Sequence, residues 1–173
     1  MDLVQYYIHL DINGIYNMTE NKIQKARSMA DGQSYFIILL ILSIWLNFIF
    51  PIRAILYAPY TYFGIMIIAF GIVLGLWSRS LFLKSKTTLS PYESPTSLVT
   101  SGPFHISRNP MYLGMAAILL GIAIFLGTLV TFIFPAIFIM IIETLFIPDE
   151  ERKLEKIFGE QYKEYKNKVR QWI

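Results

Sequence analysis

One polar stretch of this chain, residues 101–114 with the sequence SGPFHISRNPMYLG, carries residue types that bind anions. Asn109 followed by Pro110 is a helix-start signal, because the Asn side chain can accept from a free backbone N–H and Pro loses no hydrogen bond at the first helical position. A helix that begins at Pro110 directs unpaired N–H groups and the positive end of its dipole toward the surroundings of Arg108. The stretch therefore predicts an anion-binding site. The alternative is a capped loop whose arginine faces lipid headgroups.

Three glutamates near the end of the last apolar run are the second group of candidates. Glu150 and Glu151 begin a charged tail, where they either hold a cation or form a solvated cluster balanced by the basic residues that follow. Glu143 lies inside the apolar run, where an ionised carboxylate is costly unless it is hydrogen-bonded or faces a polar cavity. Glu143 and Glu150 are seven residues apart, so a continuous helix places them on one face. A binding cavity is the favoured interpretation of Glu143, and a hydrogen bond between helices is the alternative.

Composition indicates that membrane helices position these residues. Of the 173 residues 55% are hydrophobic and 16% are charged, whereas roughly 25% are charged in soluble chains. Long apolar runs make up the difference, so the membrane is expected to be the solvent and nucleic acid is not an expected partner. The chain has no cysteine, which excludes disulfides, thiolate metal sites and a cysteine nucleophile. Its two histidines, His9 and His105, lie far apart in the sequence and predict no metal site.

The apolar runs predict an all-α, polytopic membrane helix bundle of four to five transmembrane helices in a single domain. Its expected parts are an N-terminal segment (1–33), a transmembrane core (34–147) and a cytoplasmic C-terminal helix (148–173). Four spans are expected, at residues 34–50, 60–83, 111–126 and 129–147. Residues 1–16 are apolar but interrupted by polar residues, which favours an interfacial helix over a fifth span.

Small residues indicate where the spans approach one another closely. Gly71 and Gly75 lie four residues apart on one face of the second span, and a neighbouring helix is expected to pack against that face. The third span carries Gly114, Ala117 and Gly121, which allow the same close approach.

The last two spans are expected to form an antiparallel hairpin, because only Gly127 and Thr128 separate them. The hairpin brings the arginine at the start of the third span beside the glutamate pair at the end of the fourth. Pro148 is expected to interrupt the fourth helix. Beyond it, apolar residues recur every three or four positions, which predicts one amphipathic helix that covers the site. These residues are Leu154, Phe158, Tyr162, Tyr165, Val169 and Trp172.

Charge placement predicts the orientation of the bundle. Lysine and arginine gather in the loop after the second span and in the tail, and are scarce in the turns at the other end. By the positive-inside rule the loop and the tail share the cytoplasmic side. We therefore expect an integral, multi-pass membrane protein whose site faces the cytoplasm.

Two motifs resemble those of a known family. The stretch GPFHISRNPMYLG resembles the GPYxxxRHPxYxG motif of the membrane methyltransferases that include isoprenylcysteine carboxyl methyltransferases and phospholipid N-methyltransferases. The tail EERKLEKIFGEQYKEYKNKV is similar to the second motif of that family, EExxLxxxFGxxYxxYxxxV. The resemblance covers about residues 98–169, and the order and separation of the motifs make it specific. The matching residues are Gly102, Pro103, Arg108, Pro110, Tyr112 and Gly114, then Glu150, Glu151, Leu154, Phe158, Gly159, Tyr162, Tyr165 and Val169.

The resemblance implies a methyltransferase that uses S-adenosyl-L-methionine and releases S-adenosyl-L-homocysteine. It implies that the cofactor lies between the two motifs, and that Arg108 and Glu150 carry the catalytic roles. One position departs from the family: Asn109 stands where His is usual, so this side chain cannot shuttle a proton near neutral pH. The cofactor contacts implied by the resemblance are His105, Arg108, Asn109, Pro110, Tyr112, Glu150 and Glu151.

The expected substrate is a lipid or a prenylated small molecule or peptide. A carboxylate acceptor is already ionised at pH 7 and needs no base, and so carboxyl methylation of an isoprenylcysteine-like acceptor is favoured. In-line transfer then requires alignment and exclusion of water. The first alternative is a phospholipid amine N-methyltransferase, whose acceptor must lose a proton. The second is a multi-span membrane binding protein without enzymatic activity.

Overall fold

The computed structural model describes residues 32–49, 54–85 and 95–173, which form helices and connecting turns and no β-strand. The prediction for residues 1–16 and the turn at 51–53 lie outside the described residues. The α-helices are α2 (Gly32–Ile49), α3 (Phe63–Lys84), α4 (Pro110–Leu126), α5 (Ile133–Ile141), α6 (Ile147–Phe158) and α7 (Glu160–Lys168). Short 3-10 turns are η1 (Tyr60–Tyr62), η2 (Gly102–His105) and η3 (Leu129–Phe132), and η4 (Ile142–Phe146) is a π-turn.

Three helical segments are long and apolar enough to cross a membrane: Gly32–Ile49, Tyr60–Lys84 and Leu129–Phe158. The helix α4 is apolar but shorter, at 17 residues. Large apolar side chains such as Phe48, Met66 and Phe70 are exposed on the outer faces of α2 and α3, where lipid is the natural solvent. The predicted all-α polytopic bundle is confirmed.

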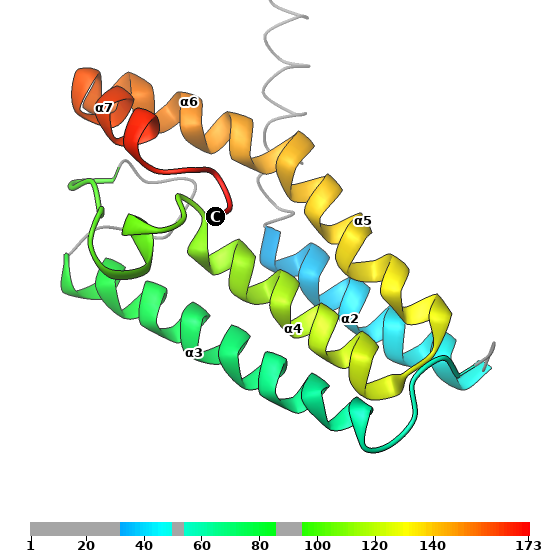
Figure 1. Cartoon of the computed structure of the whole chain (residues 1–173). Helices are drawn as coiled ribbons and strands as arrows, with labels where there is room; N and C mark the ends of the chain where they lie inside the picture. The colour runs from blue at the N-terminus through cyan, green and yellow to red at the C-terminus, as the bar shows by residue number, and fades with distance from the viewer. Residues whose placement is uncertain (1–31, 50–53, 86–94) are drawn as a thin grey trace, which may run out of the picture.

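Glycine residues bring α3 and α4 into backbone contact. A Cβ at Gly71 would lie 2.5 Å from the carbonyl oxygen of Gly114, and one at Gly64 would clash with the carbonyl oxygen of Gly121. The two pairs are seven residues apart on each helix, so they line one antiparallel seam along the bundle (Figure 1). The prediction for this face is confirmed, since a Cβ at Gly114 would lie 3.2 Å from the backbone nitrogen of Gly75, although a Cβ at Gly75 itself would meet nothing within 4 Å.

The helix that follows the hairpin turn does not stop at Pro148. It runs from η3 through α5 and η4 into α6 as one helical segment from Leu129 to Phe158, which is apolar before Pro148 and charged after it. The expected interruption is wrong because the backbone widens into a π-turn just before the proline, where the N–H of Ile147 donates to the carbonyl of Ile142. A π-turn adds one residue to the helix and changes the face that later side chains occupy.

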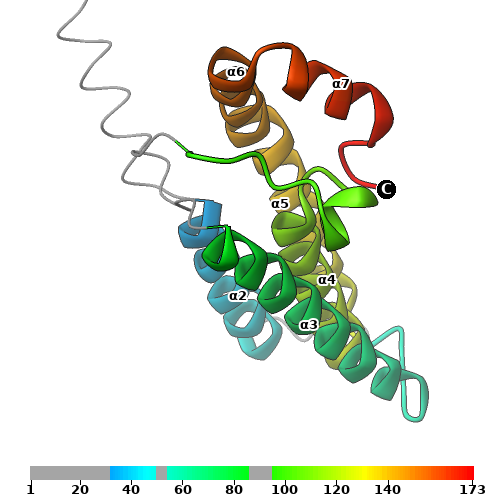
Figure 2. The same ribbon diagram turned by 90° about the vertical axis from the view of Figure 1, so that its left-hand side faces the viewer.

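The charged tail is two helices, not the single amphipathic helix that the apolar spacing predicts. Gly159 separates α6 from α7 with φ +53° and ψ −125°, a conformation that favours glycine. The helix α7 therefore turns away from the axis of α6 and lies over the end of the bundle (Figure 2). Tyr162 is buried, with 1% of its surface exposed, and Trp172 packs against the main hydrophobic core.

The core lies between α2, α4 and the α5–α6 helix, and one end of it carries the polar residues. Core side chains include Leu39, Leu119, Phe138 and Ile142. At the end of α4 where the helix begins, the segment of residues 95–109 runs beneath α6 and α7 (Figures 1 and 2). The described part of the predicted cytoplasmic loop and the charged tail thus meet at the same end of the bundle.

Candidate functional site

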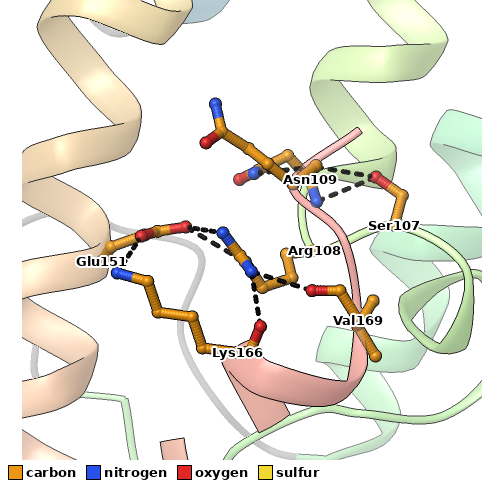
Figure 3. Close-up of polar contacts among 7 residues, drawn as sticks. Ser107, Arg108, Asn109, Glu151, Lys166 and Val169 are labelled. Atoms are coloured by element: carbon orange, nitrogen blue, oxygen red, sulfur yellow. Dashed lines mark hydrogen bonds and ion pairs between the residues drawn. The ribbon is translucent and has the colours of Figure 1, made fainter. Parts of the chain in front are cut away.

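Arg108 joins the entrance of α4 to both tail helices. Its Nε and Nη2 donate to Oε1 of Glu151 at 3.1 and 2.8 Å, and its Nη1 donates to the carbonyls of Lys166 and Val169 at 2.9 and 2.8 Å (Figure 3). The side chains of Arg108 and Glu151 are only 10% and 12% exposed. A guanidinium has five N–H donors in a fixed fork, and four hydrogen bonds here use most of them. The predicted meeting of the arginine with the glutamate pair is thus realised through Glu151.

Glu151 lies between two cations. Its second oxygen, Oε2, is 2.7 Å from Nζ of Lys166, whose side chain is 40% exposed. The carboxylate thus receives Arg108 on its buried side and Lys166 on its outer side. Such charge-assisted contacts are stronger than neutral hydrogen bonds, and together they fasten α6 to α7 and to the start of α4.

The chain beyond α7 binds residues 107–109 through its backbone carbonyls. The N–H of Arg108 donates to the carbonyl of Arg170 at 3.0 Å, and the Ser107 hydroxyl and the Asn109 side-chain amide both donate to the carbonyl of Gln171 at 3.2 Å. Asn109 occupies the N-cap position of α4, but its side chain caps no helical N–H. The capping prediction is wrong because the side-chain amide turns toward the tail instead.

Glu150 has different surroundings from its neighbour. Its Oε1 accepts a hydrogen bond of 2.6 Å from the phenol of Tyr112 on α4. Consecutive residues on a helix point about 100° apart, so Glu150 faces the bundle while Glu151 faces the tail. The Tyr112 ring lies close to α2, since a Cβ at Gly32 would be 2.7 Å from a ring carbon.

A pocket of about 240 Å³ lies between the η4–α6 segment and the tail. Glu143 and Glu151 both line it, and Glu150 does not. The expected shared face of Glu143 and Glu150 is therefore wrong: the extra residue of the π-turn brings the next glutamate into line with Glu143. The full lining is Glu143, Ile147, Pro148, Glu151, Arg152, Glu155, Lys166 and Gln171.

The structure divides the predicted site residues among three places: the tail junction, the contact of Tyr112 with Glu150 on the side of the bundle, and the exposed surface. Arg108, Asn109 and Glu151 meet at the tail, while Pro110 is buried as the first residue of α4. His105 ends η2 as an exposed residue and takes part in none of the hydrogen bonds or ion pairs found among the described residues of the site.

Sequence reasoning missed Lys166, Gln171 and Glu155 as pocket residues. Lys166 is one of seven lysines and arginines between 149 and 173, and no spacing distinguishes it from the others. Gln171 follows the end of α7, where helical periodicity carries no information. The position of Glu155 one turn after Glu151 is a signal that could have found it.

Two tyrosines hold α7 against the loop. Tyr165 donates its hydroxyl to the carbonyl of Phe104 at 2.7 Å, and burial raises the pKa of this phenol to about 12. Burial, together with the nearby Glu151 carboxylate, also raises the pKa of Tyr162 above its ordinary value. Both side chains thus stay neutral at physiological pH, and Tyr165 keeps its donor.

The fold and this junction define a class: a helical membrane protein whose charged tail folds back over the entrance of a short apolar helix. The sequence profile of the phospholipid methyltransferase family matches residues 60–161, more than half of the chain. The chain therefore belongs to that family, within the group of membrane methyltransferases related to the isoprenylcysteine carboxyl methyltransferases. Its members are methyltransferases that act on lipid substrates and generally use S-adenosyl-L-methionine.

One relative is a short protein of Haemophilus influenzae described only as uncharacterized. It is 41% identical to this chain over 63 residues, which are 36% of this chain and 100% of that protein. This relative's description adds no activity.

Proposed function

We propose that this protein transfers a methyl group from S-adenosyl-L-methionine to a lipidic acceptor, and that the cofactor occupies the pocket beside Glu151. The observation that carries this proposal is a surplus of negative charge in the pocket. Both of its cations are paired, Lys166 with Glu151 and Arg152 with Asp149. Glu143 and Glu155 form no ion pair or hydrogen bond within the described part of the chain.

The donor set fits the cofactor. S-adenosyl-L-methionine carries an ammonium and a sulfonium, and it supplies an electrophilic methyl group when bound. The unpaired carboxylate of Glu155 offers a charge partner to these cations, and opposite charges attract strongly where water is partly excluded. Ile147 and Pro148 supply the apolar part of the lining.

In this proposal Arg108 acts by positioning. Its guanidinium holds Glu151 and the carbonyls of Lys166 and Val169, so it fixes one carboxylate of the pocket wall and the position of the tail. Glu150 and Tyr112 form a second polar pair on the side of α2, where they fix the angle between α4 and α6. We place the whole site on the cytoplasmic side of a multi-pass bundle, because lysine and arginine gather at this end.

The acceptor that the pocket supports best is a phospholipid amine. A carboxylate acceptor would face the acidic wall of Glu143, Glu151 and Glu155, and Lys166 is already bound to Glu151. An amine must give up a proton before its lone pair attacks, and a carboxylate oxygen of Glu143, on the segment that crosses the membrane, can accept that proton. The family match is compatible with this acceptor and with the carboxyl acceptor alike.

A carboxyl acceptor of the isoprenylcysteine kind is the second candidate. The observation that favours it is Asn109, which stands at the motif position where a histidine base is usual and whose side chain is engaged with the tail. An ionised carboxylate needs no base, so this acceptor is compatible with an amide at that position.

A methyl-transfer assay on detergent-purified protein tests the proposal. With methyl-labelled cofactor, label should enter phosphatidylethanolamine. Glu143→Gln should reduce the rate of this methyl transfer by about 10²- to 10⁴-fold, the range typical of a lost general base. Glu160→Gln, an exposed change on α7, is the matched control and should keep full activity.

The other outcomes separate the alternatives. Transfer to farnesyl-cysteine alone would replace the amine by the carboxylate acceptor. A protein that shows no transfer to either acceptor and no heat of binding with S-adenosyl-L-homocysteine would overturn the methyltransferase proposal and favour a binding protein.

A further inference from the structure

Gln171 lies outside any helix, but contacts of residues 170–172 with the rest of the protein fix its position. On one side the carbonyl of Arg170 accepts from the N–H of Arg108 at 3.0 Å. On the other side Trp172 packs against the hydrophobic core. The carbonyl of Gln171 itself accepts from the Ser107 hydroxyl and the Asn109 amide, both at 3.2 Å. A non-helical segment needs such contacts to be ordered, because each fixed residue loses about 1–2 kcal/mol of backbone conformational entropy.

All of these anchors use backbone groups or neighbouring side chains, so the side chain of Gln171 is left for the pocket. It is the one uncharged polar side chain among the residues that line the pocket. Its carboxamide carries two N–H donors and one carbonyl acceptor. It also lies on the tail side, with Lys166, across from the carboxylates of the η4–α6 segment.

We propose that the Gln171 carboxamide binds the carboxylate of the amino-acid part of the cofactor, and that Asn109 and Ser107 are positioning residues that act through Gln171. This inference rests on the proposed function. The ligand carboxylate needs donors, the cations of the pocket are already paired, and the acidic wall repels it toward the tail. The amide of Asn109 does not titrate between pH 5 and 8, so this anchor is independent of pH over that range.

Two probes and a matched variant test the ligand assignment. S-adenosyl-L-homocysteine carries the amino-acid part, whereas 5′-methylthioadenosine lacks it. Gln171→Ala should weaken binding of S-adenosyl-L-homocysteine about tenfold or more, as expected for a lost hydrogen bond to a charged group, and leave binding of 5′-methylthioadenosine unchanged. Gln161→Ala, an exposed glutamine on α7, should change neither affinity. Isothermal titration on the full chain in detergent measures the affinities of the unaltered protein and of both variants for each probe.

Equal weakening of both probes by Gln171→Ala, or no weakening of either, would overturn the assignment of the carboxylate to Gln171. A failure of the proposed function looks different, since the unaltered protein would then bind no S-adenosyl-L-homocysteine at all.

A double-mutant cycle tests the positioning role. Asn109→Ala should weaken S-adenosyl-L-homocysteine binding severalfold in the unaltered chain, but have little further effect in the Gln171→Ala background, because its effect passes through that side chain. Additive losses in the double variant would overturn the positioning role of Asn109. A general structural role of Asn109 predicts such additivity, so the cycle distinguishes it from positioning through Gln171.

Discussion

The helix α4 makes two unlike contacts, one along its length and one at its beginning. Along its length it meets α3 through glycine, where the backbone of Gly114 faces Gly71 and that of Gly121 faces Gly64. At its beginning it meets α6 and α7 through charge, with Arg108 bound to Glu151 and to carbonyls of the tail. The first contact is made by backbone groups at these glycines, and the second combines charged and polar groups with buried side chains such as Tyr162 and Val169.

The difference follows from the solvent. Between membrane helices, apolar side chains gain nothing by leaving lipid, so close backbone approach and van der Waals contact hold the pair. At the end of the bundle, ion pairs and hydrogen bonds are strong only where water is excluded, and the low exposure of Arg108 and Glu151 meets that condition. Substitutions that add volume should therefore destabilise the glycine seam, and substitutions that remove a charge should destabilise the junction.

The largest effect is expected at the buried ion pair. Arg108→Ala leaves Glu151 in its largely buried place with only Lys166 as a partner, and should destabilise the folded protein by about 3–5 kcal/mol, the usual cost of breaking a buried pair from one side. Loss of methyl transfer should accompany it. Thermal unfolding in detergent measures the change, with the exposed Arg152→Ala as control. Equal stability of the two variants would show that the junction is not held by charge.

The glycine seam should give the next effect. Gly71→Ala places a methyl group 2.5 Å from the Gly114 carbonyl and should cost about 1–3 kcal/mol as the helices are forced apart. Gly75→Ala is the matched control on the same helix: it meets open space and should be neutral or slightly stabilising. Apparent melting temperatures that fall equally for both variants would contradict the seam.

A smaller effect is expected where α7 rests on the loop. Tyr165→Phe removes the hydrogen bond to the Phe104 carbonyl and should cost about 0.5–1.5 kcal/mol. Burial raises the pKa of Tyr165 from 10 to about 12, so the neutral phenol is favoured in the folded state. Its contribution should be complete below pH 10 and decline as the pH rises toward 12. The stability difference between the two proteins, measured across this pH range, should shrink; a constant difference would argue against the buried phenol.

The smallest effect should come from the outer partner of Glu151. Lys166 is 40% exposed, so Lys166→Ala should cost only about 0.2–1 kcal/mol, in the range of exposed pairs. The control is Lys163→Ala, which removes the exposed contact with Glu160. Thermal unfolding in detergent measures both changes. If Lys166→Ala were as unstable as Arg108→Ala, both sides of the Glu151 carboxylate would be equally shielded from water.

Much of the fold and part of the candidate site are predictable from the sequence. The long apolar runs predict the helices and the hairpin, because hydropathy and turn residues are local properties. The junction of Arg108 with the glutamate pair is predictable as a neighbourhood, since it follows from the hairpin. Which glutamate shares the face of Glu143 is not predictable. The spacing suggests Glu150, but the π-turn before Pro148 brings Glu151 onto that face.

The sequence by itself determined which segments are helical and apolar, which end of the bundle collects charge, and the family to which the chain belongs. Those properties reside in residue types and short spacings. Only the tertiary structure decided that Gly159 folds the tail back, that Asn109 binds the tail instead of capping α4, and that Lys166 and Gln171 line the pocket. The reason is physical: these features depend on competition among hydrogen-bond partners far apart in the chain, and local sequence patterns do not indicate which partner binds.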